Sequence, residues 1–276
     1  TNTDPRPLVE RLMEYNIPFH MKDTLPNLYE HWIAKDFFAY IHIVLGSRRR
    51  SDFLRIMNKP KRYVSRDALQ ESEIDFYFLK QRYEDKYWMV KRLEELEMQL
   101  AFMEQMAPAA AIHYIRQAIG YDSYLEEYAK YRRMEVQELY DVAEQIEESA
   151  RDYRDFDSWF THIDAYGEQL KEQAKERNAV ADSVEIATMH GAKGLEYPIV
   201  YLLDANEGVS PHHKAFLEED MEEERRLFYV AVTRAKERLH IYSVKERYRK
   251  PVAVSRFVGE MLIDMEAIKE GAEVIH

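Results

Sequence analysis

The stretch at residues 184–244 decides the fold class of this chain. It reads VEIATMHGAKGLEYPIVYLLDANEGVSPHHKAFLEEDMEEERRLFYVAVTRAKERLHIYSV. Two apolar runs rich in β-branched residues, 184–189 and 198–203, flank a glycine-bearing loop at 190–196. This pattern predicts two strands of a buried sheet that are joined at its edge by the loop.

A helix and a further strand are predicted after this pair. Residues 222–238 begin acidic, end basic and carry apolar residues at helical spacing, and a short apolar run at 239–244 follows. Strands that alternate with helices predict an α/β fold with a mostly parallel sheet covered on both faces. Loops at the strand ends of such sheets are the usual place for phosphate-containing ligands.

Length and composition limit the other possibilities. The 276 residues suffice for one large or two modest domains. We expect no membrane partner, because no apolar run approaches the roughly 20 residues of a membrane span, and we see no secretory signal. The absence of cysteine suits a reducing, cytoplasmic location and excludes thiolate metal sites. The net charge of -12 argues against indiscriminate coating of nucleic acid.

Residues 71–180 predict a different kind of structure. They are low in glycine and proline, and apolar residues recur every three or four positions between Tyr83 and Met103, as in a long amphipathic helix. We trust no cluster of histidines and carboxylates here as a metal site, and no metal ligands are expected. The prediction is a large all-helical segment inserted into the α/β domain.

Two motifs resemble a known family. TMHGAKGLE at 188–196 and EEERRLFYVAVTRA at 222–235 resemble motifs V and VI of the UvrD/PcrA/Rep-type superfamily-one DNA helicases. The first residues, TNTDPR, weakly resemble motif IVa through Asn2 and Arg6. The resemblance implies the C-terminal half of a bacterial ATP-dependent DNA helicase, beginning just after the first strand of the second RecA-like motor domain.

The resemblance also implies a fold and domain limits. The expected fold is a RecA-like parallel-sheet domain interrupted by a large all-helical insertion. Its first segment would be 1–46, the helical inserted domain 47–181 and its second segment 182–276. In the family, opening and closing of the cleft between two such domains drives 3′–5′ translocation on single-stranded DNA.

Site residues are carried over by motif position. Arg234 would be the catalytic arginine finger, since a planar guanidinium stays charged and can bond phosphate oxygens in pairs. Gly194 and Glu196, with Arg234, would contact the nucleotide. Without its motif, Arg234 would be interpreted as a helix-surface arginine paired with Glu237, three residues further along the same face.

The same resemblance implies the nucleic-acid contacts. Thr188, His190 and Lys193 would contact phosphates of single-stranded DNA.

The cofactor implied is ATP with Mg²⁺. No Gly-x-x-x-x-Gly-Lys-Ser/Thr loop occurs in the chain, so both would be bound mainly by a missing N-terminal RecA-like domain, itself an expected partner. We therefore expect this chain alone to be inactive as an ATP hydrolase.

The start of the insertion, residues 48–66, does not decide whether the insertion binds duplex DNA or a protein. Eight basic residues and one acid lie between residues 48 and 66, so contact with duplex DNA is possible. NKPKRYVS at 58–65 resembles the family's duplex-holding stretch, but Tyr63 and Ser65 stand where that stretch has glycines.

The alternative function is a helicase-like protein whose insertion chiefly binds a partner, such as RNA polymerase or a DNA-repair factor. A helicase–nuclease is a third, weaker option.

Overall fold

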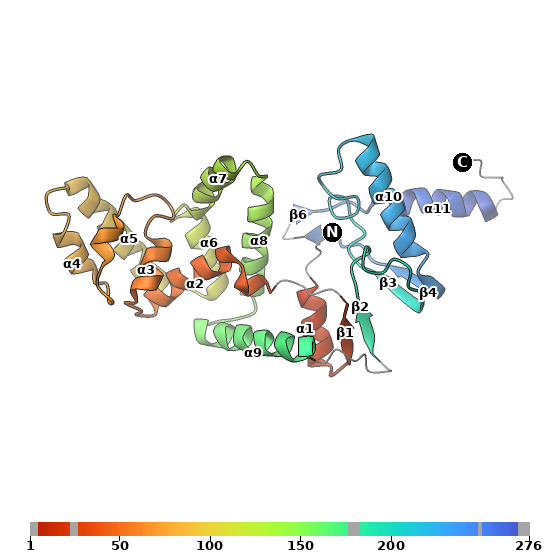
Figure 1. Cartoon of the computed structure of the whole chain (residues 1–276), viewed down its shortest axis with the longest axis horizontal. Coiled ribbons are helices and arrows are strands. Elements are labelled where there is room, and N and C mark those ends of the chain that lie inside the picture. Colours follow the sequence, from red (N-terminus) through yellow and green to blue (C-terminus); the bar gives the residue numbers. More distant parts are fainter. Residues whose placement is uncertain (1–4, 23–26, 176–182, 248–249, 270–276) are drawn as a thin grey trace. The chain divides into compact units, whose positions relative to one another are not determined.

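The computed structural model describes residues 5–22, 27–175, 183–247 and 250–269. It is mixed α/β, mostly helical, with small parallel sheets, and it divides into two compact units (Figure 1). We call Pro26–Gln169 the helical unit, and Thr1–Leu25 with Leu170–His276 the split unit. An α/β chain with parallel strands and a large helical segment is thus confirmed. The domain limits 1–46, 47–181 and 182–276 stay a prediction.

The helical unit is built around one apolar helix, α2 (Trp32–Val44), which packs against α3, α5, α6 and α8. Its buried side chains include Phe37, Tyr40 and Ile41, and Trp159 closes the same core. The elements of this unit are η1 (Leu28–Glu30), α2, α3 (Arg50–Ile56), η2 (Arg66–Leu69), α4 (Phe76–Gln81), α5 (Tyr87–Met103), α6 (Pro108–Gln117), α7 (Tyr121–Arg132), α8 (Val136–Ser149) and most of α9 (Phe156–Lys175).

The split unit takes its shape from two pairs of parallel strands. The strand β1 (Phe19–Met21) pairs with β2 (Val184–Ile186), and β3 (Tyr197–Leu202) pairs with β4 (Ala235–Ile241). Because parallel neighbours need a crossover, α10 (Glu218–Val232) connects β3 to β4. The remaining elements are α1 (Arg6–Glu14), the antiparallel pair β5 (Glu246–Arg247) and β6 (Lys250–Pro251), and α11 (Arg256–Lys269).

The core of the split unit lies between α10, the end of β3 and the start of α11. Leu202, Ala205, Phe228, Ala231 and Phe257 form this buried cluster. The rings of Phe228 and Phe257 lie 5.5 Å apart. This packing fixes α10 against the sheet, and with it the turn that leads into β4.

Two details of the prediction were wrong. The expected helix at 222–238 ends at Val232, and the strand expected at 239–244 begins at Ala235, because the main chain after α10 enters the ladder with β3. The amide of Tyr197 already bonds the carbonyl of Arg234 at 2.9 Å. Helical spacing in 233–238 is therefore overridden by strand pairing.

The strands are also less buried than expected. Most β3 side chains are half or fully exposed, and Leu202 is the buried one. In the described residues each parallel sheet has two strands, and β2 and β3 pair with β1 and β4 rather than with each other. Small sheets of this kind bury few of their side chains.

Candidate functional site

The loop that joins β2 to β3 carries most of the predicted site residues. The hydroxyl oxygen of Thr188 accepts a hydrogen bond from the amide of Gly191 at 3.0 Å, and the Thr188 carbonyl accepts from the amide of Ala192 at 3.0 Å. Thr188 is half-buried and closes the first turn of the loop. Its position makes it a support for the residues that follow.

His190 and Lys193 lie on the outside of this loop. Both are exposed, and within the described part of the chain no side-chain partner is found for either. The amide of Lys193 bonds the carbonyl of His190 at 3.2 Å, so the two residues belong to one turn. An exposed ammonium and imidazole next to each other suit a phosphate group better than a core role.

Gly194 ends the turn in the left-handed region, with φ of +82°. A Cβ atom built there would meet nothing within 4 Å. The glycine is therefore required by the backbone conformation and not by a close neighbour. This conformation turns the chain into Leu195 and then into β3.

Arg234 lies directly after α10, between the helix and β4. Its Nε donates to the carbonyl of Val230 at 2.7 Å, Nη2 to the hydroxyl of Thr233 at 2.9 Å and Nη1 to the carbonyl of Leu195 at 2.9 Å. The last bond joins the two predicted motifs, because Leu195 belongs to the loop. All three acceptors are uncharged oxygens, so none of them neutralises the positive charge of the guanidinium.

The alternative pairing of Arg234 with Glu237 is not seen among the described residues. Glu237 lies on β4 and not on a helix with Arg234, so the helical three-residue spacing no longer applies. The structure brings Arg234 to the loop instead.

Glu196 has a partner that sequence reasoning did not identify. Lys236 on β4 approaches its carboxylate at 3.2 Å, with 55% and 59% of the lysine and glutamate side chains exposed. Such a pair contributes little to stability. Glu196 can therefore exchange Lys236 for a ligand at small cost.

Asn206 is a supporting residue that the sequence did not single out. It is 1% exposed, and its amide nitrogen donates to the carbonyls of Val244 at 2.8 Å and Ala253 at 3.0 Å. Its oxygen accepts from the amide of Val244 at 3.0 Å. Three segments that are distant in sequence are thereby fixed below the end of β3. An asparagine four residues after the end of an apolar strand was the available signal.

Two ion pairs hold α11 in place. Glu207 binds Arg256 with an oxygen–nitrogen distance of 2.7 Å, and the bonds from Arg256 lower the pKa of Glu207. Arg225 on α10 binds Glu260 at 2.8 Å. Arg225, in the charged first part of the predicted motif VI, thus helps to hold α11 against α10.

The basic cluster at the start of the helical unit divides into internal and exposed members. Arg62 is 7% exposed and donates to main-chain carbonyls, including that of Ile56 at 3.1 Å. Lys59 and Arg55 bind the buried carboxylate of Asp36 at 2.7 and 3.0 Å. Arg50 bonds the carbonyl of Leu69. The exposed members are Arg48, Arg49, Lys61 and Arg66.

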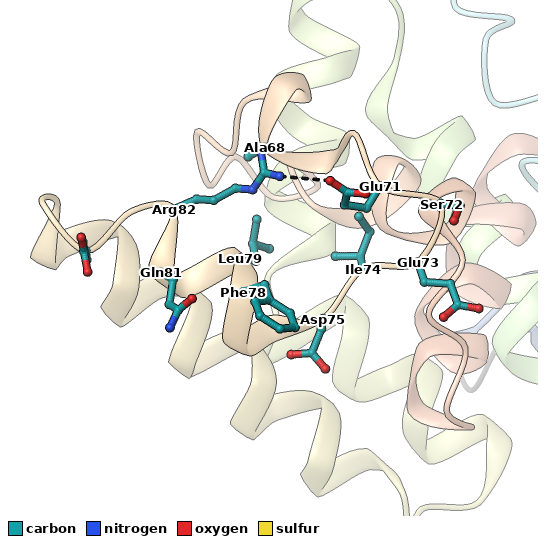
Figure 2. Close-up of a pocket in the computed structure, with 11 residues that line it drawn as sticks. Ala68, Glu71, Ser72, Glu73, Ile74, Asp75, Phe78, Leu79, Gln81 and Arg82 are labelled. Atoms are coloured by element: carbon teal, nitrogen blue, oxygen red, sulfur yellow. Dashed lines mark hydrogen bonds and ion pairs between the residues drawn. The ribbon is translucent and has the colours of Figure 1, made fainter.

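The helical unit also carries an open groove of about 840 Å³ (Figure 2). Its apolar part comes from Ile74, Leu79 and the ring of Phe78, which is 64% exposed. Four carboxylates and one arginine line it, and Arg82 reaches Glu71 at 3.4 Å. None of the predicted site residues lies here. The charged lining residues are Glu71, Glu73, Asp75, Glu84 and Arg82.

Comparison with known proteins defines the class of this chain. Residues 1–246 match the family of UvrD-like helicase C-terminal domains. The match covers most of the chain, including the loop and α10, and the chain therefore belongs to this family.

Particular relatives share this similarity at modest identity. The chain is 27% identical to the ATP-dependent DNA helicase PcrA of Bacillus subtilis over 292 residues, which covers 96% of the chain and 39% of that protein. It is 27% identical to the ATP-dependent DNA helicase Rep of Salmonella typhimurium over 289 residues, or 94% of the chain and 42% of that protein. The chain thus spans about two fifths of the length of these relatives.

Among the described residues, no group of three or more histidine, aspartate or glutamate side chains could hold a metal ion. In the same part of the chain, no helix has the length and apolar character needed to cross a bilayer.

Proposed function

We propose that the chain is the C-terminal motor half of an ATP-dependent DNA helicase that translocates 3′–5′ on single-stranded DNA. In this proposal the split unit is the second RecA-like motor domain and the helical unit its insertion. The observation that carries the proposal is the guanidinium of Arg234, which bonds three neutral oxygens, one of them the carbonyl of Leu195 in the motif V loop.

The guanidinium of Arg234 is suited to bind a phosphate group of the nucleotide. The charge of Arg234 is not neutralised by a carboxylate in the described structure, and arginine can bond phosphate oxygens through its planar fork. ATP bound with Mg²⁺ on the other motor domain would supply the phosphoryl group. Arg234 would then stabilise negative charge that spreads over the phosphoryl oxygens in the transition state. Gly194 and the exposed carboxylate of Glu196 would lie on the sugar side.

The DNA contacts are assigned to the outer side of the same loop. Lys193 and His190 present their polar groups to solvent, and Thr188 holds the turn on which they lie. The carbonyl of Leu195 accepts a hydrogen bond from Arg234, and Leu195 lies two residues after Lys193. A movement of Arg234 on nucleotide hydrolysis would therefore reach the proposed DNA-binding turn through Leu195. This short connection would couple hydrolysis to stepping.

Hydrolysis of ATP tests the proposal. The chain alone should be inactive, and joining it to the N-terminal motor domain should give hydrolysis stimulated by single-stranded DNA. Arg234→Ala in that longer protein should lower turnover about 1,000-fold, with nucleotide affinity little changed. Arg238→Ala, which removes an exposed arginine from β4, is the matched control and should not affect turnover. Hydrolysis by the chain alone, or full turnover in Arg234→Ala, contradicts the proposal.

The acidic groove favours a second candidate function, in which the helical unit chiefly binds a partner protein. Its carboxylate lining and the exposed ring of Phe78 would suit a basic peptide with one apolar anchor. Phe78→Ala should then weaken partner binding, whereas Phe102→Ala, which removes an equally exposed ring from α5, should not. Equal binding by both variants argues against this function.

A further inference from the structure

A cluster of aromatic and basic side chains, all exposed except the half-buried Arg92, lies on the helical unit. It joins the loop after α3 to the first turns of α5. We call it the aromatic–basic patch. Its members are Lys61, Tyr63, Lys86, Tyr87, Trp88, Lys91 and Arg92.

The centre of the aromatic–basic patch is a contact between two rings and two cations. The rings of Tyr63 and Trp88 lie 6.3 Å apart, nearly perpendicular at 80°. The guanidinium of Arg92 lies 5.0 Å from the Trp88 ring and 5.4 Å from the Tyr63 ring, and the ammonium of Lys61 lies 4.8 Å from Tyr63. These are distances of cation–π attraction.

The start of α5 extends this arrangement. The ammonium of Lys91 lies 4.9 Å from the ring of Tyr87, and that of Lys86 lies 5.9 Å from the ring of Tyr83. Trp88, Lys91 and Arg92 lie three and four residues apart, so one face of the helix presents them together.

The cations of the aromatic–basic patch are not neutralised by carboxylates. Within the described residues, Lys61, Lys86, Lys91 and Arg92 have no carboxylate at ion-pair distance. One guanidinium nitrogen of Arg92 is buried without a hydrogen-bond partner there. Elsewhere in the same unit, Lys80 pairs with Glu97 at 2.7 Å. These four cations thus form no ion pair within the described residues, although the chain as a whole has a net charge of -12.

Tyr63 occupies a backbone position that disfavours a side chain. Its φ is +64°, a region that glycine adopts readily and residues with a Cβ rarely do. The ring gains little burial in exchange, since Tyr63 is 55% exposed, Trp88 49% and Tyr87 70%. Packing within the chain therefore does not account for a tyrosine here.

We propose that the aromatic–basic patch binds single-stranded DNA by stacking unpaired bases on Tyr63 and Trp88. Base faces are available in a single strand and hidden in a duplex, and aromatic rings with adjacent cations suit a base and its phosphate together. This inference rests on the proposed function for its ligand. It adds that the insertion of this chain contacts bases, and not only the backbone of a duplex.

Titration of the chain with short oligonucleotides tests the inference. An oligothymidylate should quench the tryptophan fluorescence, and an abasic strand with the same phosphates should bind about tenfold more weakly. Trp88→Ala and Tyr63→Ala should each weaken binding of oligothymidylate by a similar factor, and Trp88→Phe should largely retain it. Tyr131→Ala, which removes a tyrosine that is 83% exposed on α7, is the matched control.

The outcomes separate this inference from the proposed function. If Lys193→Ala weakens binding of the single strand and Trp88→Ala does not, the aromatic–basic patch is not a base-binding site and the motor assignment stands. Equal affinity for the abasic strand, preference for duplex, or no measurable binding also overturns the inference. Hydrolysis by the completed enzyme tests the motor assignment independently.

Discussion

Single residues decide how the helical unit is held together, and Asp36 is the clearest case. Its carboxylate is fully buried and binds Arg55 at 3.0 Å, Lys59 at 2.7 Å and the hydroxyl of Tyr121 at 2.6 Å. Burial and this carboxylate also raise the pKa of Tyr124 to about 12. One acid on α2 thus fixes α3, the following loop and α7 around the central helix.

Replacing Asp36 by alanine should destabilise the chain by about 3 kcal/mol, because Lys59 and Arg55 lose a buried partner. Denaturant unfolding followed by tryptophan fluorescence measures this, since all three tryptophans (Trp32, Trp88 and Trp159) lie in the helical unit. Glu71→Gln removes the exposed pair with Arg82 and should cost about 0–1 kcal/mol. A loss for Asp36→Ala as small as that of the control would show that water replaces the carboxylate.

At the scale of elements, the connections around β3 and β4 position the candidate site. The end of α10 at Val232 places Arg234 in the short connection before β4, where it reaches the carbonyl of Leu195. At the same end of β3, the left-handed Gly194 turns the loop into the strand. Both features depend on where elements end, and helical spacing predicted the end of α10 about six residues too late.

Two glycine substitutions should change stability in opposite directions. Gly194→Ala forces a side chain into a left-handed position and should cost about 1 kcal/mol, although no neighbour obstructs the new methyl group. Gly259→Ala, on an exposed position of α11 that is also free of neighbours, should stabilise by about 0.5–1 kcal/mol. Denaturant unfolding followed by circular dichroism compares the two. The same sign for both variants would disprove the conformational explanation.

At the scale of the whole molecule, net charge limits where the proposed binding of DNA could occur. The net charge of -12 repels a polyanion, so binding depends on places where basic groups are not paired with acids. Such places are the outer side of the motif V loop and the aromatic–basic patch. Four of the eight basic residues between 48 and 66 are instead bonded within the fold, namely Arg50, Arg55, Lys59 and Arg62.

The affinity for single-stranded DNA should therefore fall with salt concentration only as steeply as the few unpaired cations of the aromatic–basic patch require. Four cations of the aromatic–basic patch correspond to a slope of about −3 for the logarithm of affinity against the logarithm of salt concentration. Lys91→Ala should reduce its magnitude by about 0.7. Lys80→Ala should leave it unchanged, because Lys80 is already paired with Glu97. Fluorescence anisotropy at several salt concentrations gives the slopes, and identical slopes for the two variants would count against the aromatic–basic patch.

The sequence by itself determined the family of the chain, and it predicted the residues of the candidate site. Motif residues such as Arg234 and Lys193 lie in two continuous stretches, and the helical character of residues 71–180 follows from a local repeat of apolar positions. Local structure of this kind can be predicted from sequence, because residues that are close in sequence lie in one helix or loop. The strand exposure and the end of α10 were mispredicted, since pairing with β3 overrides the local preference.

Only the tertiary structure decided which distant side chains meet. The bond from Arg234 to Leu195, the fixing of three segments by Asn206 and the contact of Tyr63 with Trp88 each join residues well separated in sequence. No periodicity predicts such contacts, because they depend on how whole elements pack and on which polar groups that packing leaves to be satisfied. The motif V loop was thus readable from its sequence, whereas the aromatic–basic patch arises from folding alone.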